Sequence, residues 1–93
     1  MKKYDNEMLR ALLNNAASQI LLGLKRNNGS CKLSIAQELD VTYSHIIKIL
    51  SLFKVQNLVT FEKDGRIVKT TLTQKGMDVA TKLQEIEDLI RAN

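Results

Sequence analysis

The chain has 93 residues, of which 44% are hydrophobic and 26% charged, so it suits one small globular domain rather than a disordered tail. Its apolar runs fall far short of the roughly 20 residues that a membrane span needs, and we expect no secretory signal peptide. One cysteine and one histidine do not supply an internal disulfide, a metal centre or a familiar catalytic site. We therefore expect a cytoplasmic protein, not an enzyme, that uses no metal or cofactor.

The positive charge is concentrated in the middle of the chain. The formal net charge is +4, and residues 42–75 contain six basic and two acidic residues, an excess of four positive charges. Residues 76–93 contain two basic and four acidic residues. Basic surfaces attract polyanions such as nucleic acids, although so modest an excess is also common on ordinary solvated faces.

Residues 5–28 are predicted to form a helical region. Asp5 is a suitable N-cap, and apolar residues recur at helical spacing from Leu9 onward. The helix is expected to break near Asn14 and Asn15, because asparagine favours helix caps over helix interiors.

Residues 34–56 are predicted to form a helix-turn-helix. After a short strand over residues 31–33, Ser34 and Gln37 match the Ser-x-x-Gln capping box that opens a helix. Thr42 then caps a second helix, which is expected to run from Tyr43 to about Gln56. The expected buried face of that helix follows the i, i+3, i+4, i+7 spacing and consists of Ile46, Ile49, Leu50 and Phe53.

Residues 58–72 are predicted to form a β-hairpin. Strands at 58–62 and 67–72 flank a turn whose Asp64-Gly65 pair is the preferred centre of a type I′ turn. Asn57 precedes the hairpin, and asparagine tolerates the left-handed conformation in which helices often end.

Residues 74–91 are predicted to form the last helix, with Thr73 as its cap. Its apolar positions include the three-four spacing of a seam that packs on another helix: Met77, Ala80, Leu83, Ile86, Leu89 and Ile90. The order of elements predicts one mainly α-helical domain of the α+β class over residues 1–93, a winged helix-turn-helix with the hairpin as its wing.

The outer face of the second helix carries the side chains best placed to touch DNA. If the apolar face points inward, that outer face consists of Tyr43, Ser44, Ile47, Lys48, Ser51 and Lys54. Exposed serine and lysine are equally common on any solvated helix, so each residue alone is ambiguous. His45 is expected either to contact a phosphate or to pack half-exposed beside the first helix.

The hairpin adds three cations, Lys63, Arg66 and Lys69, of which Arg66 is best placed for the minor groove or a phosphate. The alternative is that these charges protect the edge of the hairpin from aggregation. Cys31 is expected to be a small buried strand thiol or, alternatively, to form a disulfide bridge between two copies.

From Leu33 to about Ala80 the chain resembles winged-helix transcription regulators of the MarR and related ArsR type, including small versions from archaea and their viruses. The matching segments are SIAQELDV, TYSHIIKILSLF, NLV, DGR and TLTQKG, and the last of these is the most specific. The resemblance implies DNA contacts at Ser34, Tyr43, Ser44, Ile47 and Lys48, with Arg66 as the wing-tip arginine. The chain departs from the family pattern in its very short wing, in Asn57 at a usual glycine, and in Ile47 at a frequent polar position.

Regulators of this type usually dimerise through their terminal helices, so the resemblance implies a homodimer on a near-palindromic double-stranded DNA site. The expected interface residues are Leu9, Leu12, Leu13, Ala80, Leu83, Ile86 and Ile90. No residue specifies an effector ligand. The alternative function is a winged-helix protein-protein interaction module of a transcription or replication complex.

Overall fold

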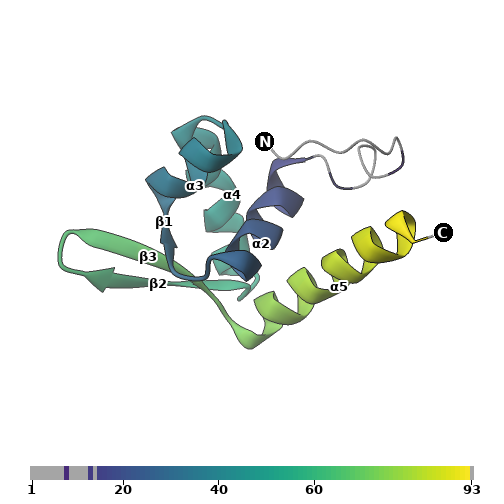
Figure 1. Ribbon diagram of the computed structural model, residues 1–93. Helices are drawn as coiled ribbons and strands as arrows, with labels where there is room; N and C mark the ends of the chain where they lie inside the picture. The colour runs from purple at the N-terminus through teal and green to yellow at the C-terminus, as the bar shows by residue number, and fades with distance from the viewer. Residues whose placement is uncertain (1–7, 9–12, 14, 93) are drawn as a thin grey trace.

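The computed structural model describes Met8, Leu13 and residues 15–92 of the chain. In this part four helices pack beside a small antiparallel sheet of three strands, whose hairpin extends beyond them (Figure 1). The elements are α2 (Ala16–Arg26), β1 (Ser30–Cys31), α3 (Lys32–Leu39), α4 (Tyr43–Val55), β2 (Val59–Asp64), β3 (Ile67–Leu72) and α5 (Gln74–Arg91). The predicted helix start at Asp5 lies outside the described residues.

Helix α2 begins at the asparagine pair that was expected to interrupt the N-terminal region. The side chain of Asn15 is the N-cap and accepts a hydrogen bond from the backbone N–H of Ser18 at 2.9 Å. Buried Gln19 in the first turn donates from Nε2 to the carbonyl of Leu13 at 2.9 Å, which connects Leu13 to this helix. The predicted break is therefore confirmed at Asn15.

The start of α3 differs from the prediction. The helix begins at Lys32, two residues before Ser34, and its N-cap Cys31 makes no side-chain capping bond. The reason is a tertiary contact, because Cys31 pairs with Lys69 of β3 and its extended backbone ends strand β1 there. The capping box at Ser34 and Gln37 was therefore wrong, and the predicted short strand forms at Ser30–Cys31 rather than over residues 31–33.

Helix α4 matches its prediction closely. Its N-cap Thr42 accepts a hydrogen bond from the backbone N–H of His45, and Asn57 just beyond the helix has a φ of 61°. The four residues of the predicted inner face are all buried in the main core: Ile46, Ile49, Leu50 and Phe53. Thirteen residues of regular helix thus separate a buried apolar face from an exposed outer face.

The hairpin forms as predicted but closes with a different turn. Asp64 pairs with Ile67, so the two central turn residues are Gly65 and Arg66 rather than Asp64 and Gly65. Gly65 has a φ of +64° and Arg66 is not left-handed, which is the pattern of a type II′ turn rather than type I′. Compared with an Asp64-Gly65 turn, the register is shifted by one residue along each strand, so Asp64 joins β2 and Arg66 leaves β3 for the turn.

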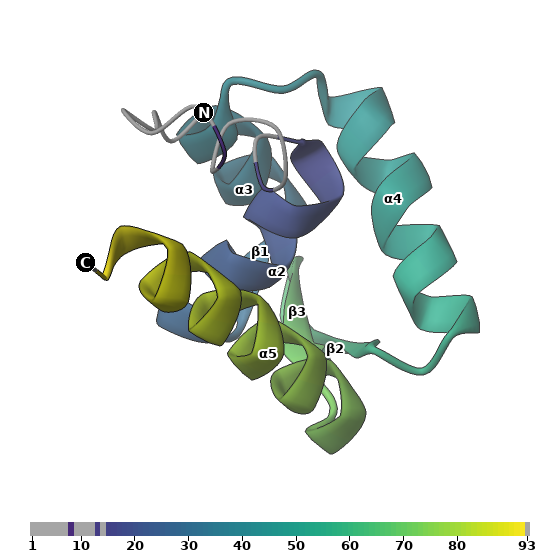
Figure 2. The same cartoon turned by 90° about the vertical axis from the view of Figure 1, so that its right-hand side faces the viewer.

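Strand β3 lies at the centre of the sheet, between β1 and β2. The main core fills the space between the sheet and helices α2, α3, α4 and α5. Figure 2 shows α4 on one side of α2 and α5 on the other. The outer face of α4 therefore points away from α5.

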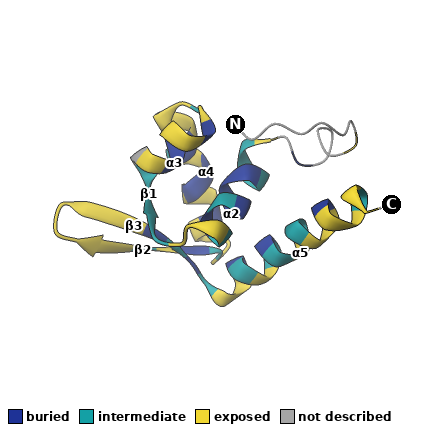
Figure 3. Ribbon diagram, in the orientation of Figure 1, coloured by how far each residue is buried: buried dark blue, intermediate teal, exposed yellow. Residues whose placement is uncertain are grey.

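The molecule is elongated, with principal extents of 46 × 26 × 20 Å. The wing and the C-terminal part of α5 project from the body in opposite directions, and most of the wing is solvent-exposed (Figures 1 and 3). Among the described residues, no helix combines the length and apolar character needed to cross a bilayer. The wing and the C-terminal part of α5 are the two projecting elements that are accessible to other molecules.

Candidate nucleic-acid interface

The outer face of α4 is accessible along its whole length. Tyr43, Ser44, His45, Lys48, Ser51 and Lys54 are all exposed, and Ile47 is partly buried. The rotational phase predicted from the apolar spacing is therefore correct. His45 is exposed as well, so its imidazole is accessible to a phosphate.

Two residues on this face already use part of their bonding capacity inside the chain. The Ser51 hydroxyl donates to the backbone carbonyl of Ile47 at 2.8 Å, so its remaining capacity is as an acceptor. The Lys54 ammonium lies 5.6 Å from the centre of the Phe61 ring on β2. Ser44 and Lys48, toward the start and middle of the helix, are exposed beside Tyr43 and His45.

Lys32 joins the basic surface, which was not predicted. Its ammonium lies 4.5 Å from the centre of the same Phe61 ring. Lys32 opens α3, and only the pairing of β1 with β3 brings that helix start beside the wing. No local sequence signal identifies such a contact, because Lys32 and Phe61 are far apart in the chain.

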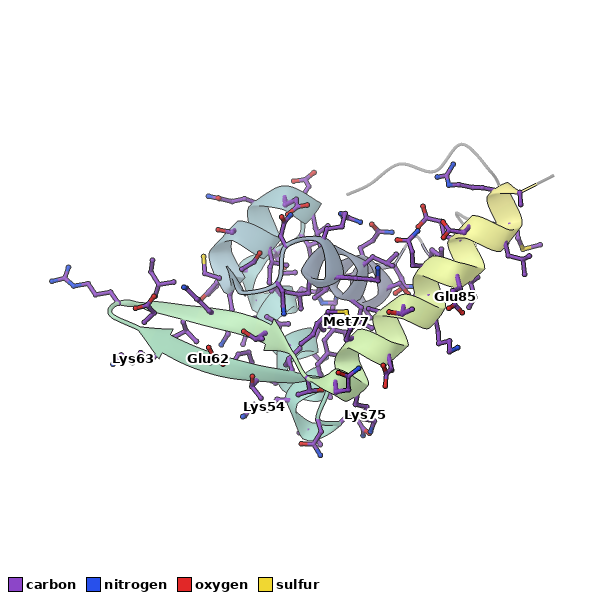
Figure 4. All side chains as sticks on the ribbon, turned by 60° about the horizontal axis from the view of Figure 1, so that its bottom comes forward. Lys54, Glu62, Lys63, Lys75, Met77 and Glu85 are labelled. Carbon is purple, nitrogen blue, oxygen red and sulfur yellow. The ribbon has the colours of Figure 1, made fainter. Side chains whose placement is uncertain are left out.

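The wing presents two cations, Lys63 and Arg66. Neither of them takes part in an ion pair among the described residues. Lys69 differs, because its Nζ lies 3.2 Å from Oδ2 of Asp64 in an exposed ion pair. In Figure 4 Lys63 lies toward the wing tip, whereas Lys54 lies nearer the body of the molecule. The basic surface thus extends from the end of α4 to the tip of the hairpin.

A cavity of about 270 Å³ lies between the start of α4 and the wing. Its walls come from β1, α3, α4 and the wing: Cys31, Lys32, Tyr43, Arg66, Ile67 and Val68. Two cations and a phenol at the rim of an open hollow suit an anionic group such as a phosphate. Because Tyr43 comes from the helix and Arg66 from the wing, the cavity joins the two candidate DNA-contacting elements.

Cys31 is partly buried beside the exposed Ser34. Its sulfur lies 3.1 Å from the Ser34 Oγ, and the thiol forms no disulfide within the chain. The predicted disulfide between copies stays a prediction. Among the described residues, no group of three or more histidine, cysteine, aspartate or glutamate side chains is arranged to bind a metal ion.

The predicted dimer residues do not share one environment. Leu13 and Ala80 are 1% and 0% exposed inside the single chain, so they have no surface left to bury in a dimer. Leu83 and Ile90 are partly buried against Leu13. Assigning Leu13 and Ala80 to an interface was therefore wrong, because the spacing of apolar residues does not distinguish an internal contact from an external one.

The C-terminal half of α5 nevertheless keeps an apolar surface. Ile86 is 42% exposed and Leu89, which was absent from the predicted interface, is 77% exposed. Leu9 and Leu12 lie outside the described residues. The available surface on α5 is therefore centred on Ile86 and Leu89.

Comparison with known proteins identifies the fold. No protein-family model matches the sequence, and no curated protein matches it. Among solved structures, AF1382 from Archaeoglobus fulgidus aligns with a TM-score of 0.84 and 24% identity over 94% of this chain and 100% of that one.

Two structures described as regulators also match. MepR, a transcription regulator of the Staphylococcus aureus multidrug efflux pump MepA, aligns with a TM-score of 0.76 and 20% identity over 92% of this chain and 66% of that one. SPO1453 of Silicibacter pomeroyi, a MarR family transcriptional regulator, aligns with a TM-score of 0.72 and 23% identity over 89% of this chain and 61% of that one. The chain thus has the winged helix-turn-helix fold of MarR-type regulators, and it spans less than two thirds of the length of each of these two regulators.

Proposed function

We propose that this protein is a sequence-specific, double-stranded DNA-binding transcription regulator that acts as a homodimer. In this proposal α4 enters the major groove and the wing contacts the flanking backbone or minor groove. The observation that carries the proposal is the exposed outer face of α4, with Ser44 and Lys48 accessible opposite a fully buried apolar face. The fold shared with transcription regulators supports the same conclusion.

The residues of α4 divide into base contacts and backbone contacts. Lys48 has the reach and charge to bind guanine O6 and N7 or a phosphate, and Ser44 can donate to a base or accept from one. Ile47 contributes an apolar surface that suits a thymine methyl group. Tyr43 and Ser34 are placed for phosphate or sugar oxygens at the edge of the groove.

The wing side of the site is suited to the DNA backbone. A phosphate entering the cavity beside Tyr43 would meet the cations of Lys32 and Arg66. At the exposed turn, Arg66 can also enter a narrow minor groove, where the negative potential is enhanced. Lys63 adds a further backbone contact.

Dimerisation is assigned to α5, through the exposed Ile86 and Leu89 with Leu83 and Ile90 at the margin. Two copies related by a two-fold axis would place their α4 helices roughly 34 to 36 Å apart, one turn of DNA, so the site should be near-palindromic. The proposal makes the chain a binding protein rather than an enzyme, and it fits a cytoplasmic location.

Selection of bound duplexes from a random pool tests the proposal. We expect enrichment of a symmetric motif whose half-sites are about one helical turn apart. A pool that stays random after repeated rounds at low salt would refute sequence-specific binding. A single unpaired half-site would refute the dimeric arrangement alone.

A protein-protein interaction module is the second candidate function. It is supported by Leu52 and Val55, which are 59% and 75% exposed on α4. They form an i, i+3 apolar pair on the same helix as the proposed DNA contacts. The selection experiment separates the two functions, because an interaction module would enrich no duplex.

A further inference from the structure

The turn that ends α4 is bonded to the start of α5 through three consecutive backbone carbonyls. The Lys75 Nζ donates to the carbonyl of Gln56 at 3.0 Å, and the Thr73 hydroxyl donates to the carbonyl of Asn57. The backbone N–H of Thr73 donates to the carbonyl of Leu58 at 3.0 Å. Three donors from Thr73 and Lys75 at the beginning of α5 therefore satisfy the carbonyl of Gln56, which the end of α4 leaves without a helical partner, and those of the two turn residues that follow it.

The same junction is closely packed at Gly76. A Cβ atom at this position would lie 1.9 Å from the carbonyl oxygen of Leu58, so only glycine allows α5 to approach the turn this closely. The backbone of α5 is thus in direct contact with the segment that follows α4. Figure 4 shows Lys75 at the start of α5, on this side of the molecule.

We propose that Lys75 is a positioning residue that fixes the angle between α4 and α5. This inference rests on the proposed function. In the proposed dimer α5 forms the interface and α4 lies in the groove, so the angle at this junction sets the distance between the two recognition helices. Lys75 acts on that angle because its ammonium binds the C-cap residue of α4 itself, at the negative end of the helix dipole.

The length of α4 amplifies a change of angle at this end. Thirteen residues make a helix about 20 Å long, so a tilt of about 6° at Gln56 displaces Tyr43 by about 2 Å. Two copies moving in opposite directions change the separation by about 4 Å, close to the rise of one base pair, about 3.4 Å. Loss of the Lys75 bond should therefore change which half-site spacing the dimer prefers.

Lys75 is also suited to a clean test because its side chain is exposed. An exposed charged hydrogen bond contributes little to folding stability, so its loss should leave the Tm within about 2 °C of the wild-type value. A changed spacing preference in such a variant cannot come from unfolding.

The test compares Lys75→Met with Lys75→Arg, which retains a donor, and with Lys82→Met, which removes an exposed lysine further along α5. Each protein is titrated with the duplex selected by the wild type and with duplexes whose half-sites are one or two base pairs closer or further apart. For each protein the ratio of affinities between spacings is compared, because a uniform loss of affinity cancels in that ratio.

We expect the wild type, Lys75→Arg and Lys82→Met to lose about 10-fold or more in affinity for a one-base-pair change. In Lys75→Met the affinity ratio between the two spacings should be at least threefold smaller than in the wild type, or the preferred spacing should shift by one base pair. Wild-type spacing ratios in Lys75→Met would overturn the positioning role while leaving the proposed function intact. If the wild type selects no symmetric duplex, the proposed function fails and this inference fails with it.

Discussion

Lys48 and Asp64 show how single charges shape the proposed interface. Lys48 is exposed on α4 and belongs to no ion pair among the described residues, so its charge is available to DNA. Asp64 has the opposite effect on the wing, because it pairs with Lys69 at 3.2 Å and adds a negative charge beside Arg66. The wing is therefore less basic than its count of lysine and arginine suggests.

Removing the Asp64 charge should strengthen DNA binding. Asp64→Asn eliminates one negative charge and releases Lys69 to contact a phosphate, so the affinity for duplex DNA should rise severalfold at low salt. Fluorescence anisotropy with a labelled duplex measures the change. Asp88→Asn, which makes the same charge change on α5, serves as the control and should leave the affinity within about twofold. Equal effects of the two substitutions would show that the wing does not contact DNA.

A single glycine allows one helix to approach another segment closely, whereas a glycine in a second helix has no such role. Gly76 in α5 lies against the backbone of Leu58, where a Cβ atom would come within 1.9 Å of the carbonyl oxygen. At Gly23 in α2 a Cβ atom would make only ordinary van der Waals contact, because the nearest atom is an Arg26 side-chain nitrogen at 3.9 Å. The same substitution should therefore have opposite signs at the two positions.

Gly76→Ala should lower the Tm by at least about 5 °C, because the overlap with the backbone costs more than the gain of up to about 1 kcal/mol in helix propensity. Gly23→Ala should raise the Tm by a few degrees, since it gains the propensity without the overlap. Thermal unfolding followed by circular dichroism measures both. An unchanged or higher Tm in Gly76→Ala would contradict the packing at the junction of α4 and α5.

The sequence predicted elements where local signals agree and failed where tertiary contacts decide. Helix α4 was predictable because the Thr42 cap, the spacing of its apolar residues and Asn57 all indicate the same helix. Helix α3 was misplaced because the pairing of Cys31 with Lys69 sets its start, and that contact spans much of the chain. The turn of the wing was misassigned because the strand register, rather than the Asp-Gly pair, places Gly65 first in the turn.

The residues of the candidate site were likewise predictable where the helical period places them and not where tertiary contacts do. The outer face of α4 follows directly from the helical period, so Ser44 and Lys48 were identified correctly as exposed. Lys32 was missed, because only the folded sheet brings the start of α3 to the wing. Leu13 and Ala80 were misassigned, because an apolar stripe does not indicate whether its partner lies within the chain or in a second copy.

The whole molecule places its two projecting elements at opposite ends, the wing at one and the C-terminal part of α5 at the other (Figure 1). A chain of 93 residues has a limited core, and association would bury the apolar surface that α5 leaves exposed. In the proposed dimer the α5 ends meet at the two-fold axis, while α4 and the wing remain free for DNA.

Leu89→Glu should convert the dimer to a monomer, because a charge is placed in an apolar contact and meets its own copy across the two-fold axis. Sedimentation equilibrium measures the mass of the particle. Leu52→Glu is the matched control, since Leu52 is also more than half exposed but lies on α4. The control should keep the dimeric mass. A wild type that sediments as a monomer at high concentration, or a Leu89→Glu variant that stays dimeric, would contradict the α5 interface.

The most direct test of DNA binding through α4 and the wing is the salt dependence of duplex affinity in the wild type and in Lys48→Ala. If three or four cations per protomer neutralise phosphates, a plot of log K against log salt concentration should fall with a slope of roughly −5 to −7. Lys48→Ala should make the slope shallower by about two, one contact in each protomer, and Lys82→Ala should leave it unchanged. A wild-type slope near zero, or the same steep slope in Lys48→Ala, would contradict the assignment of this surface to DNA.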